Sequence, residues 1–227
     1  EATGDNGKEA PVKYLGDGYF QVGLVKINSR KKTIAFPGSV NMREGAVEYI
    51  LVHLNGKTHE SIFTTKVKPE DLHIAALLLG VKPQYDLGAA GRGTKVDDNA
   101  ALVINVKWER NGPTADYPLH ELVALKKDPS APSRSSLSPL PWLYNGSMIS
   151  EKGSFQAGSS GSFISIIRDP EALMNYAGES RANDDIHAPN SDKLPKKDHP
   201  IEFIIKVLGG SRVVDKGQKS PSLPDSD

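Results

Sequence analysis

The sequence contains no cysteine, and this absence removes several classes of protein at once. Disulfide scaffolds, thiolate nucleophiles, iron–sulfur clusters and zinc sites with thiolate ligands all require that side chain. The absence is compatible with the cytosol, and also with a periplasm in which an unpaired thiol is a liability. A core remains possible without disulfides, because a chain of 227 residues can bury roughly 70% of the surface that its unfolded form exposes.

The sequence also lacks net charge and a long hydrophobic run. Lys and Arg total 28, and so do Asp and Glu, so no net field favours a polyanion. We therefore expect neither nucleic acid nor an anionic membrane surface as a partner. The longest strongly apolar run, Ile74 to Leu79, is far shorter than the roughly 20 residues of a membrane helix, so no transmembrane segment is expected.

The ends of the chain differ in composition from its middle. The chain starts at Glu1 with a polar segment, which we interpret as what remains after a secretion leader is removed; an arbitrary chain boundary is the alternative. This interpretation predicts a periplasmic or extracellular location. Residues 1–12 and 209–227 are predicted to be disordered. Between them we expect a single domain over 13–208, with an irregular, proline- and serine-rich connection at 128–141.

Runs rich in β-branched and aromatic residues recur along the chain between turn residues. They predict a fold that is α+β and mainly β, with antiparallel sheets forming a sandwich or an open barrel. Pro37-Gly38 is expected to end one of the strands. Outside the central hairpin described next, the expected strands are 20–27, 33–36, 100–109, 117–125, 142–149, 154–157, 162–167 and 201–208.

The clearest local signal is Asn55-Gly56, which separates two β-rich runs, Val47 to Leu54 and Lys57 to Val67. Asn-Gly favours positive φ at both central positions of a two-residue type I′ turn, so these runs are predicted to form an antiparallel hairpin. That register places Val52 opposite His59. Both faces of the ribbon are apolar near its middle, which indicates a central hairpin covered on both sides.

Two helices are predicted. The first covers about 69–80, because Pro69 suits the first helical position and Gly80 suits the C-terminal stop. Its apolar residues extend nearly all round, so we expect it to be buried. The second is short, covering about 169–176, with Asp169-Pro170 supplying the N-cap and the first turn.

Four segments resemble the YdjY-type domain, an uncharacterised family of bacterial and mostly exported proteins. They are Ile34 to Gly45 continuing into Val47 to Val52, then Gly56 to Ser61, then Leu72 to Gly80, and finally Trp142 to Ser147 followed by Gly-Ser-Phe-Ile-Ser-Ile and Asp169 to Leu173. The resemblance spans roughly residues 20 to 208. It implies a fold and an exported location but no activity. Some members carry a cysteine-rich ferredoxin-like module, and electron transfer through clusters of its own is excluded for this cysteine-free chain.

The best candidate polar site consists of His59, Glu60, Ser61 and His73. Histidine can act as a base or a ligand, but alternation along a strand places His59 and Ser61 on one face and Glu60 on the other. These three cannot form a compact triad by themselves, although His73 on the helix could approach one face. The structural alternative is that Glu60 is a buried acceptor that ties a neighbouring backbone to the hairpin.

A second candidate is a ligand groove formed by Trp142, Tyr144 and Asn145, since aromatic residues beside polar turns can bind sugars or peptides. The structural alternative is that Trp142 packs on the core where the chain re-enters the sheet. No metal-ligand spacing is present, so we expect no metal site and no cofactor.

The hypothesis that follows is a non-catalytic binding or assembly module of the periplasm or cell surface, with an envelope protein or a small ligand as its partner. The alternative is a metal-dependent or acid/base enzyme with a site around His59, Glu60 and His73.

Overall fold

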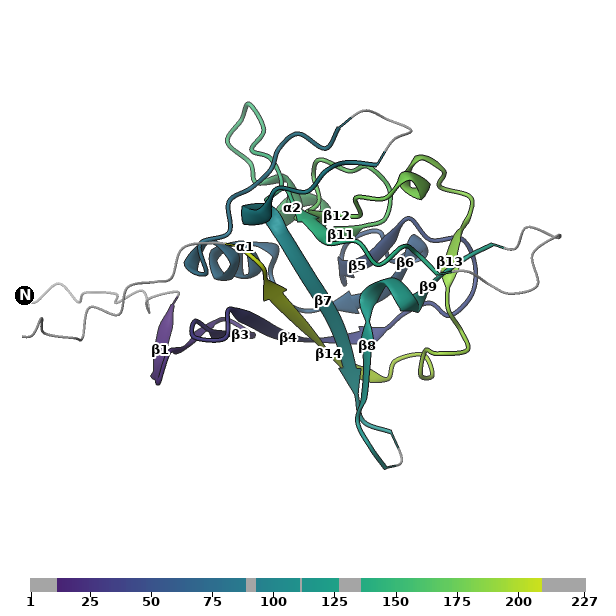
Figure 1. Ribbon diagram of the computed structural model, residues 1–227, viewed down its shortest axis with the longest axis horizontal. Helices are drawn as coiled ribbons and strands as arrows, with labels where there is room; N and C mark the ends of the chain where they lie inside the picture. The colour runs from purple at the N-terminus through teal and green to yellow at the C-terminus, as the bar shows by residue number, and fades with distance from the viewer. Residues whose placement is uncertain (1–11, 89–92, 111, 127–135, 210–227) are drawn as a thin grey trace, which may run out of the picture.

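The computed structural model describes residues 12–88, 93–110, 112–126 and 136–209. Its main feature is a sheet that closes into an eight-stranded barrel (Figure 1). The barrel strands are β4 (Thr33–Val40), β5 (Tyr49–His53), β6 (Ser61–Thr65), β7 (Ala101–Trp108), β10 (Trp142–Tyr144), β11 (Ser162–Ser165), β12 (Met174–Asn175) and β14 (Pro200–Val207). Their order around the barrel is β4-β14-β7-β10-β12-β11-β5-β6, and β6 returns to β4.

Smaller elements surround the barrel. A ribbon of β1 (Lys13–Gly16), β2 (Tyr19–Val22) and β3 (Val25–Asn28) extends the sheet from β4, and β8 (Ala115–Pro118) pairs with β7. A separate two-stranded sheet joins β9 (Val123–Leu125) to β13 (His187–Pro189). The α-helices are α1 (Pro69–Leu78) and α2 (Gln156–Ser160), and the 3-10 helices are η1 (Thr58–Glu60), η2 (Asp98–Ala100), η3 (Leu119–Leu122) and η4 (Glu179–Ala182).

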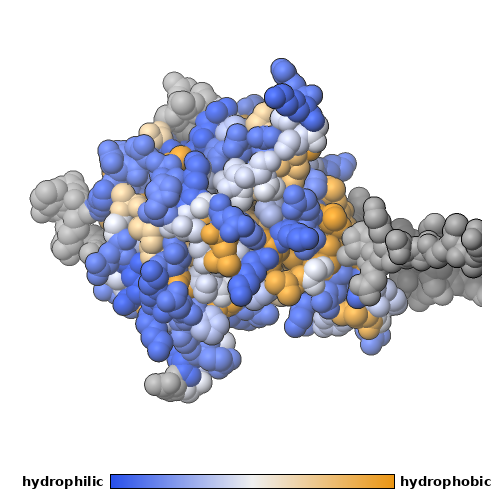
Figure 2. Space-filling model, turned by 180° about the vertical axis from the view of Figure 1, so that it is seen from behind, coloured by the Kyte–Doolittle hydropathy of each residue, from blue (hydrophilic) through white to orange (hydrophobic). Residues whose placement is uncertain are grey.

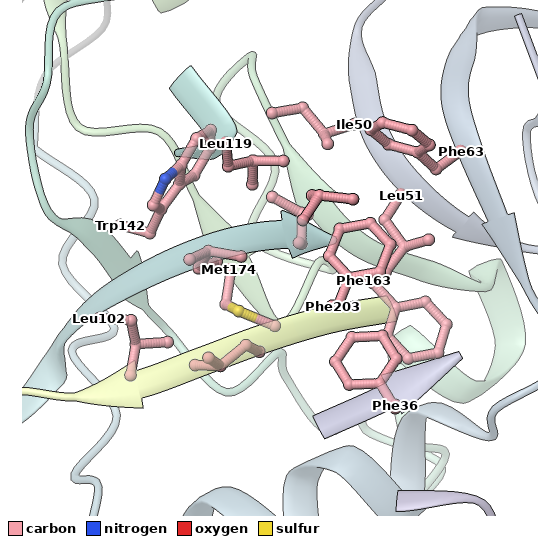
Figure 3. Close-up of a cluster of buried hydrophobic side chains, with 14 of the residues drawn as sticks. Phe36, Ile50, Leu51, Phe63, Leu102, Leu119, Trp142, Phe163, Met174 and Phe203 are labelled. Atoms are coloured by element: carbon pink, nitrogen blue, oxygen red, sulfur yellow. The ribbon is translucent and has the colours of Figure 1, made fainter. Parts of the chain in front are cut away.

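The predicted strands 100–109 and 201–208 are confirmed as β7 and β14, and these two neighbouring strands form the spine of the barrel. β14 lies between β4 and β7, with Phe203 opposite Phe36 on one side and Val106 on the other. Alternate residues of β14 point inward, as a period of two requires. Phe203 stacks on Phe36 at 5.2 Å and meets the edge of Phe63 at 5.5 Å (Figure 3). This aromatic cluster fills the middle of the core.

The mainly-β class is confirmed, but the architecture differs from the one expected. The barrel is closed, which replaces the sandwich or open barrel. It is also not wholly antiparallel, because β5 pairs with β6 and β11 with β12 in parallel. The disordered ends predicted at 1–12 and 209–227 lie almost entirely outside the described residues, as does most of the 128–141 connection. The single domain over 13–208 stays a prediction.

Helix α1 lies where the sequence predicts it, but only one of its faces is buried. Leu72, Ala75 and Ala76 are buried, whereas Leu77 is 47% exposed. The reason is that α1 packs on the outside of the sheet, beside β2, β3 and α2, so these elements cover only one side of it. Figure 2 shows hydrophobic side chains gathered in a few patches on a face that is otherwise mostly hydrophilic. No helix in the described ranges is long and apolar enough to cross a membrane.

The predicted hairpin around Asn55-Gly56 is wrong. β5 and β6 pair in parallel, with Tyr49 opposite Ser61, and η1 lies in the connection between them. Neither Asn55 nor Gly56 has positive φ, so no type I′ turn forms. Gly56 serves close packing instead, because a Cβ atom there would lie 3.0 Å from the carbonyl oxygen of Ser160.

The short helix predicted at 169–176 is also wrong. Asp169 does accept a hydrogen bond from the Glu171 N–H, as an N-cap would. However, the carbonyl oxygens of Pro170 and Ala172 accept from the side-chain amide of Asn145, at 3.1 and 2.7 Å. These carbonyl oxygens bond to a side chain instead of to the backbone N–H groups of an α-helix. The chain continues into β12 rather than into a helix.

Other predicted strands need smaller corrections. The run 117–125 is divided by η3 into the end of β8 and β9, and the run 142–149 forms a strand only as far as Tyr144. The run 20–27 is two strands, because Gly23 adopts a φ of +53° and turns the chain between β2 and β3. Pro37-Gly38 does not end a strand, since β4 continues through it to Val40. The run 154–157 overlaps α2 instead of forming a strand.

Candidate functional site

The predicted polar site divides into two parts. His59 and Glu60 lie on η1, where the His59 side chain is 80% exposed and that of Glu60 is 21% exposed. The His59 Nε2 and Glu60 Oε2 atoms are 3.8 Å apart. Glu60 also lies 3.8 Å from the Lys57 ammonium, within one turn of chain. This half of the site is a small charged cluster at the surface.

The other two predicted residues have partners elsewhere. Ser61 is buried, and its hydroxyl donates to the Phe63 carbonyl oxygen at 2.8 Å. His73 on α1 lies with its Nδ1 atom 2.7 Å from the Tyr144 hydroxyl, and burial lowers the pKa of its imidazole. The structure records no contact between His73 and either His59 or Glu60. Within the described residues, no three His, Asp or Glu side chains are grouped to hold a metal ion.

The predicted groove residues lie in the interior. Trp142, Tyr144 and Asn145 are all buried. The Trp142 indole lies beside Leu119 in the core cluster (Figure 3), and its ring centroid is 5.6 Å from that of Tyr176. The packing interpretation therefore describes Trp142, and these three side chains do not line an open groove in this structure.

Asn145 instead takes part in a buried network that the sequence did not reveal. We call Asn145, Asn175, Asp169, Tyr49 and Lys57 the polar chain. The Asn175 amide donates to Asn145 Oδ1 and to the Asp169 carbonyl oxygen, both at 2.8 Å, and its own Oδ1 accepts from the Asp169 N–H. The network joins β10, β12 and the turn that replaces the predicted second helix.

The outer end of the polar chain reaches the surface. The Tyr49 hydroxyl donates to Asp169 Oδ2 at 2.9 Å and accepts from the Lys57 ammonium at 2.8 Å. Burial and the neighbouring Asp169 carboxylate raise the pKa of the Tyr49 phenol far above its ordinary value. The phenol therefore stays protonated and acts as a bridge between a cation and an anion rather than as a base.

A separate feature is a cleft of about 450 Å³ beside the end of β7. We define this cleft by its lining residues Trp108, Arg110, Asp192, Lys193, Leu194 and His199, to which the neighbouring Glu109 and Pro195 also contribute. The volume falls within the range of small-molecule sites. None of the residues predicted from sequence lines the cleft.

The segment on the far side of the cleft is fixed to the barrel through Asn190. Its side-chain amide donates to the Glu121 carbonyl oxygen at 2.9 Å, and its backbone N–H donates to that of Leu122. The Lys193 ammonium forms an ion pair with Glu121 at 2.5 Å. At the other end of this segment, the His199 Nε2 atom lies 3.1 Å from the Glu109 carbonyl oxygen. These bonds hold residues 190–199 against η3 and the end of β7.

Aromatic rings and cations meet behind the cleft. The Trp108 and Tyr117 rings stack with centroids 5.2 Å apart. The Arg110 guanidinium lies 5.9 Å, and the Lys193 ammonium 5.5 Å, from the centroid of the Tyr117 ring. Such cation–π contacts orient the two basic side chains without neutralising them.

Some of the charged side chains that line the cleft have an ion-pair partner and others do not. Lys193 is paired with Glu121, whereas the one hydrogen-bond acceptor of Arg110 among the described residues is the neutral Tyr117 hydroxyl, at 3.4 Å. Asp192 is exposed and has no ion-pair or hydrogen-bond partner among the described side chains. Besides the cation Arg110, the cleft thus presents two carboxylates without an ion-pair partner in the described part of the chain: that of Asp192, and that of Glu109, which accepts a bond from the Thr114 hydroxyl at 3.3 Å. Sequence reasoning missed Arg110 and Asp192, because nothing in the local pattern shows that residues 110 and 192 share a cavity.

A family model described as the YdjY domain matches residues 25–206. No curated protein matches the chain, and no solved structure matches it.

Proposed function

The chain belongs to the YdjY domain family, and on this premise we propose that it is a non-catalytic binding module of the periplasm or cell surface. The proposal assigns binding to the cleft between the end of β7 and residues 190–199. Its partner is a small ligand, or an exposed part of an envelope protein, that enters this cleft.

The observation that carries the proposal is the open bonding capacity of the cleft. Arg110 and Asp192 line one cavity without an ion-pair partner in the described part of the chain, beside the nearly buried Trp108 and Leu194. Concave sites with an apolar lining and a few convergent polar groups are typical of ligand pockets. The envelope location is supported by the exported character that the family resemblance implies, and the absence of cysteine is compatible with it.

The residues of the enzyme alternative give it no common site. His59 and Glu60 lie at the surface on η1, while His73 on α1 forms a hydrogen bond with the Tyr144 hydroxyl. An acid/base or metal mechanism needs its groups within hydrogen-bond or ligand distance of one reacting atom. Protein purified without chelator tests this alternative: a stoichiometric transition metal that is lost in a His73→Ala variant would overturn the non-catalytic proposal.

The binding proposal is tested by the two tryptophans, the only two in the sequence. Trp108 lines the cleft and Trp142 lies in the core, so their indole N–H signals in a nitrogen-15 NMR spectrum report on different places. In a fragment screen we expect hits to shift the Trp108 signal and leave that of Trp142 in place. Hits that concentrate elsewhere on the surface would contradict the assignment of binding to the cleft.

The location needs a separate measurement. Cells that express the protein from its native gene, with its native N-terminus, are fractionated and probed with an antibody. We expect the protein in the periplasmic or surface fraction. A cytosolic location would leave the binding site in place and refute the envelope part of the proposal.

A further inference from the structure

We propose that the cleft binds a zwitterionic ligand, an amino acid or short peptide that carries both a free ammonium and a free carboxylate. The proposal rests on the proposed function, because it assumes that the cleft is a binding site, and it adds the chemical class of the ligand.

Two opposite charges line the cleft without pairing with each other. Arg110 and Asp192 both contribute to its wall, yet they do not lie within ion-pair distance of one another. A guanidinium presents a planar fork that suits a carboxylate, and a carboxylate is a natural acceptor for an ammonium group. A ligand with one charge of each sign satisfies both residues at once.

Ligands of a single charge fit less well. A simple anion would meet Arg110 but would also lie near the carboxylates of Glu109 and Asp192, which line the same cavity. Lys193 offers little further attraction, because Glu121 already pairs with it at 2.5 Å. A simple cation would be attracted by the two carboxylates but would leave Arg110 without a partner. A neutral ligand would exclude water from both charges without replacing its hydrogen bonds, which is unfavourable.

The remaining wall offers a ligand little apolar surface. It is formed by Trp108, Leu194 and Pro195, but Trp108 is only 4% and Leu194 only 5% exposed. The two open charges are therefore the features of the cleft on which recognition of the ligand depends.

Four probes of matched shape test the charge requirement. They are L-alanyl-L-phenylalanine, its N-acetylated form, its C-terminal amide, and the form blocked at both ends. Each is titrated into the full chain, with binding followed by calorimetry and by the Trp108 indole signal. We expect the free dipeptide to bind at least about tenfold more tightly than either singly blocked form, which corresponds to the loss of one charge-assisted hydrogen-bonded contact.

Matched variants locate the two charges. Arg110→Gln is expected to lower the affinity for the free dipeptide about tenfold while changing little for the carboxyl-blocked form, and Asp192→Asn is expected to act in the same way toward the amino-blocked form. The controls are Arg30→Gln and Asp17→Asn, which alter an exposed ion pair of 3.9 Å on the β1–β3 ribbon and its turn to β4. Neither control should change the affinity.

The outcomes separate this inference from the function beneath it. A blocked form that shifts the Trp108 signal and binds as tightly as the free dipeptide would overturn the zwitterionic class and leave the cleft as a binding site. The same holds if Asp192→Asn has no effect. If none of the four probes moves the Trp108 signal, both the ligand class and the assignment of binding to the cleft lose their support.

Discussion

The polar chain and the cleft both collect polar side chains, but they treat them in opposite ways. In the polar chain, every side chain from Asn145 to Lys57 has a hydrogen-bond partner within the protein. In the cleft, Arg110 and Asp192 lack a charged partner in the described part of the structure. A satisfied buried network stabilises one conformation, whereas open charges in a cavity remain free to bind a ligand. The contrast indicates that the polar chain stabilises the fold and that the cleft binds a ligand.

The strongest test of the contrast is Asn175→Ala. The variant removes three hydrogen bonds of a buried amide and leaves the Asp169 backbone and the Oδ1 atom of Asn145 without the bonds that Asn175 provides. We expect the free energy of unfolding to fall by about 3 to 4 kcal/mol, measured by denaturant titration. Asn183→Ala, at an exposed position, is the control and should cost less than about 0.5 kcal/mol. A small loss for Asn175→Ala would remove the structural role of the polar chain.

The second test concerns an exception to the satisfied interior. Among the described buried side chains, His187 Nδ1 and Ser162 Oγ lack a hydrogen-bond partner. Burial lowers the pKa of His187 to about 4, below the ordinary value near 6.5. The unfolded chain therefore binds this proton first as the pH falls, so folding stability is lost between about pH 6.5 and pH 4.

We expect His187 to account for a loss on the order of 2 to 3 kcal/mol across that interval, seen as the difference between the native chain and His187→Gln in unfolding curves at several pH values. His59→Gln is the control, since that side chain is 80% exposed. Parallel pH profiles for the native chain and His187→Gln would show that His187 protonates freely in the folded state.

The third test is Tyr49→Phe, which keeps the ring and removes the hydroxyl that bridges Lys57 and Asp169. We expect a loss of about 1 to 2 kcal/mol in the free energy of unfolding, because the half-buried Asp169 carboxylate loses a donor. Tyr19→Phe, at an exposed position of β2, should leave stability within about 0.5 kcal/mol. Equal effects of the two variants would show that the outer end of the polar chain is solvated.

The smallest expected effect completes the comparison. Arg110→Gln and Asp192→Asn should each change the free energy of unfolding by less than about 0.5 kcal/mol, because both side chains are exposed and neither forms an ion pair. Thermal unfolding of each variant measures this. A large loss of stability for either variant would indicate that the residue stabilises the fold, and would weaken the assignment of binding to the cleft.

The elements that sequence reasoning predicted correctly are those with a strong local period. β14 alternates buried and less buried residues along its eight positions and β7 does so from Leu102 to Trp108, and α1 carries a proline at its start and a glycine just after its end. The same reasoning failed at Asn55-Gly56 and at Asp169-Pro170. In both places a local signal was outweighed by partners distant in sequence: Gly161 bonds to His53, and Asn145 takes the carbonyl oxygens of Pro170 and Ala172.

The candidate site shows the same difference between local sequence signals and contacts between distant segments. Sequence reasoning selected His59, Glu60, Ser61 and His73 because their residue types carry chemistry, but it relied on a hairpin that does not form. Tyr49 bonds to Asp169, 120 positions further along the chain, and Arg110 lines the same cleft as Asp192, 82 positions further along. No periodic pattern connects positions so far apart.

By itself, the sequence determined the mainly-β class, the place of α1, the strands of the barrel spine and membership of the YdjY domain family, because composition, short-range periodicity and family motifs are properties of the chain alone. Only the tertiary structure decided that the barrel closes, that β5 and β6 run in parallel, and which polar side chains are satisfied and which remain open. The physical reason is that these features depend on hydrogen bonds and packing between distant segments, whose energies outweigh the local preferences of a turn or a helix cap.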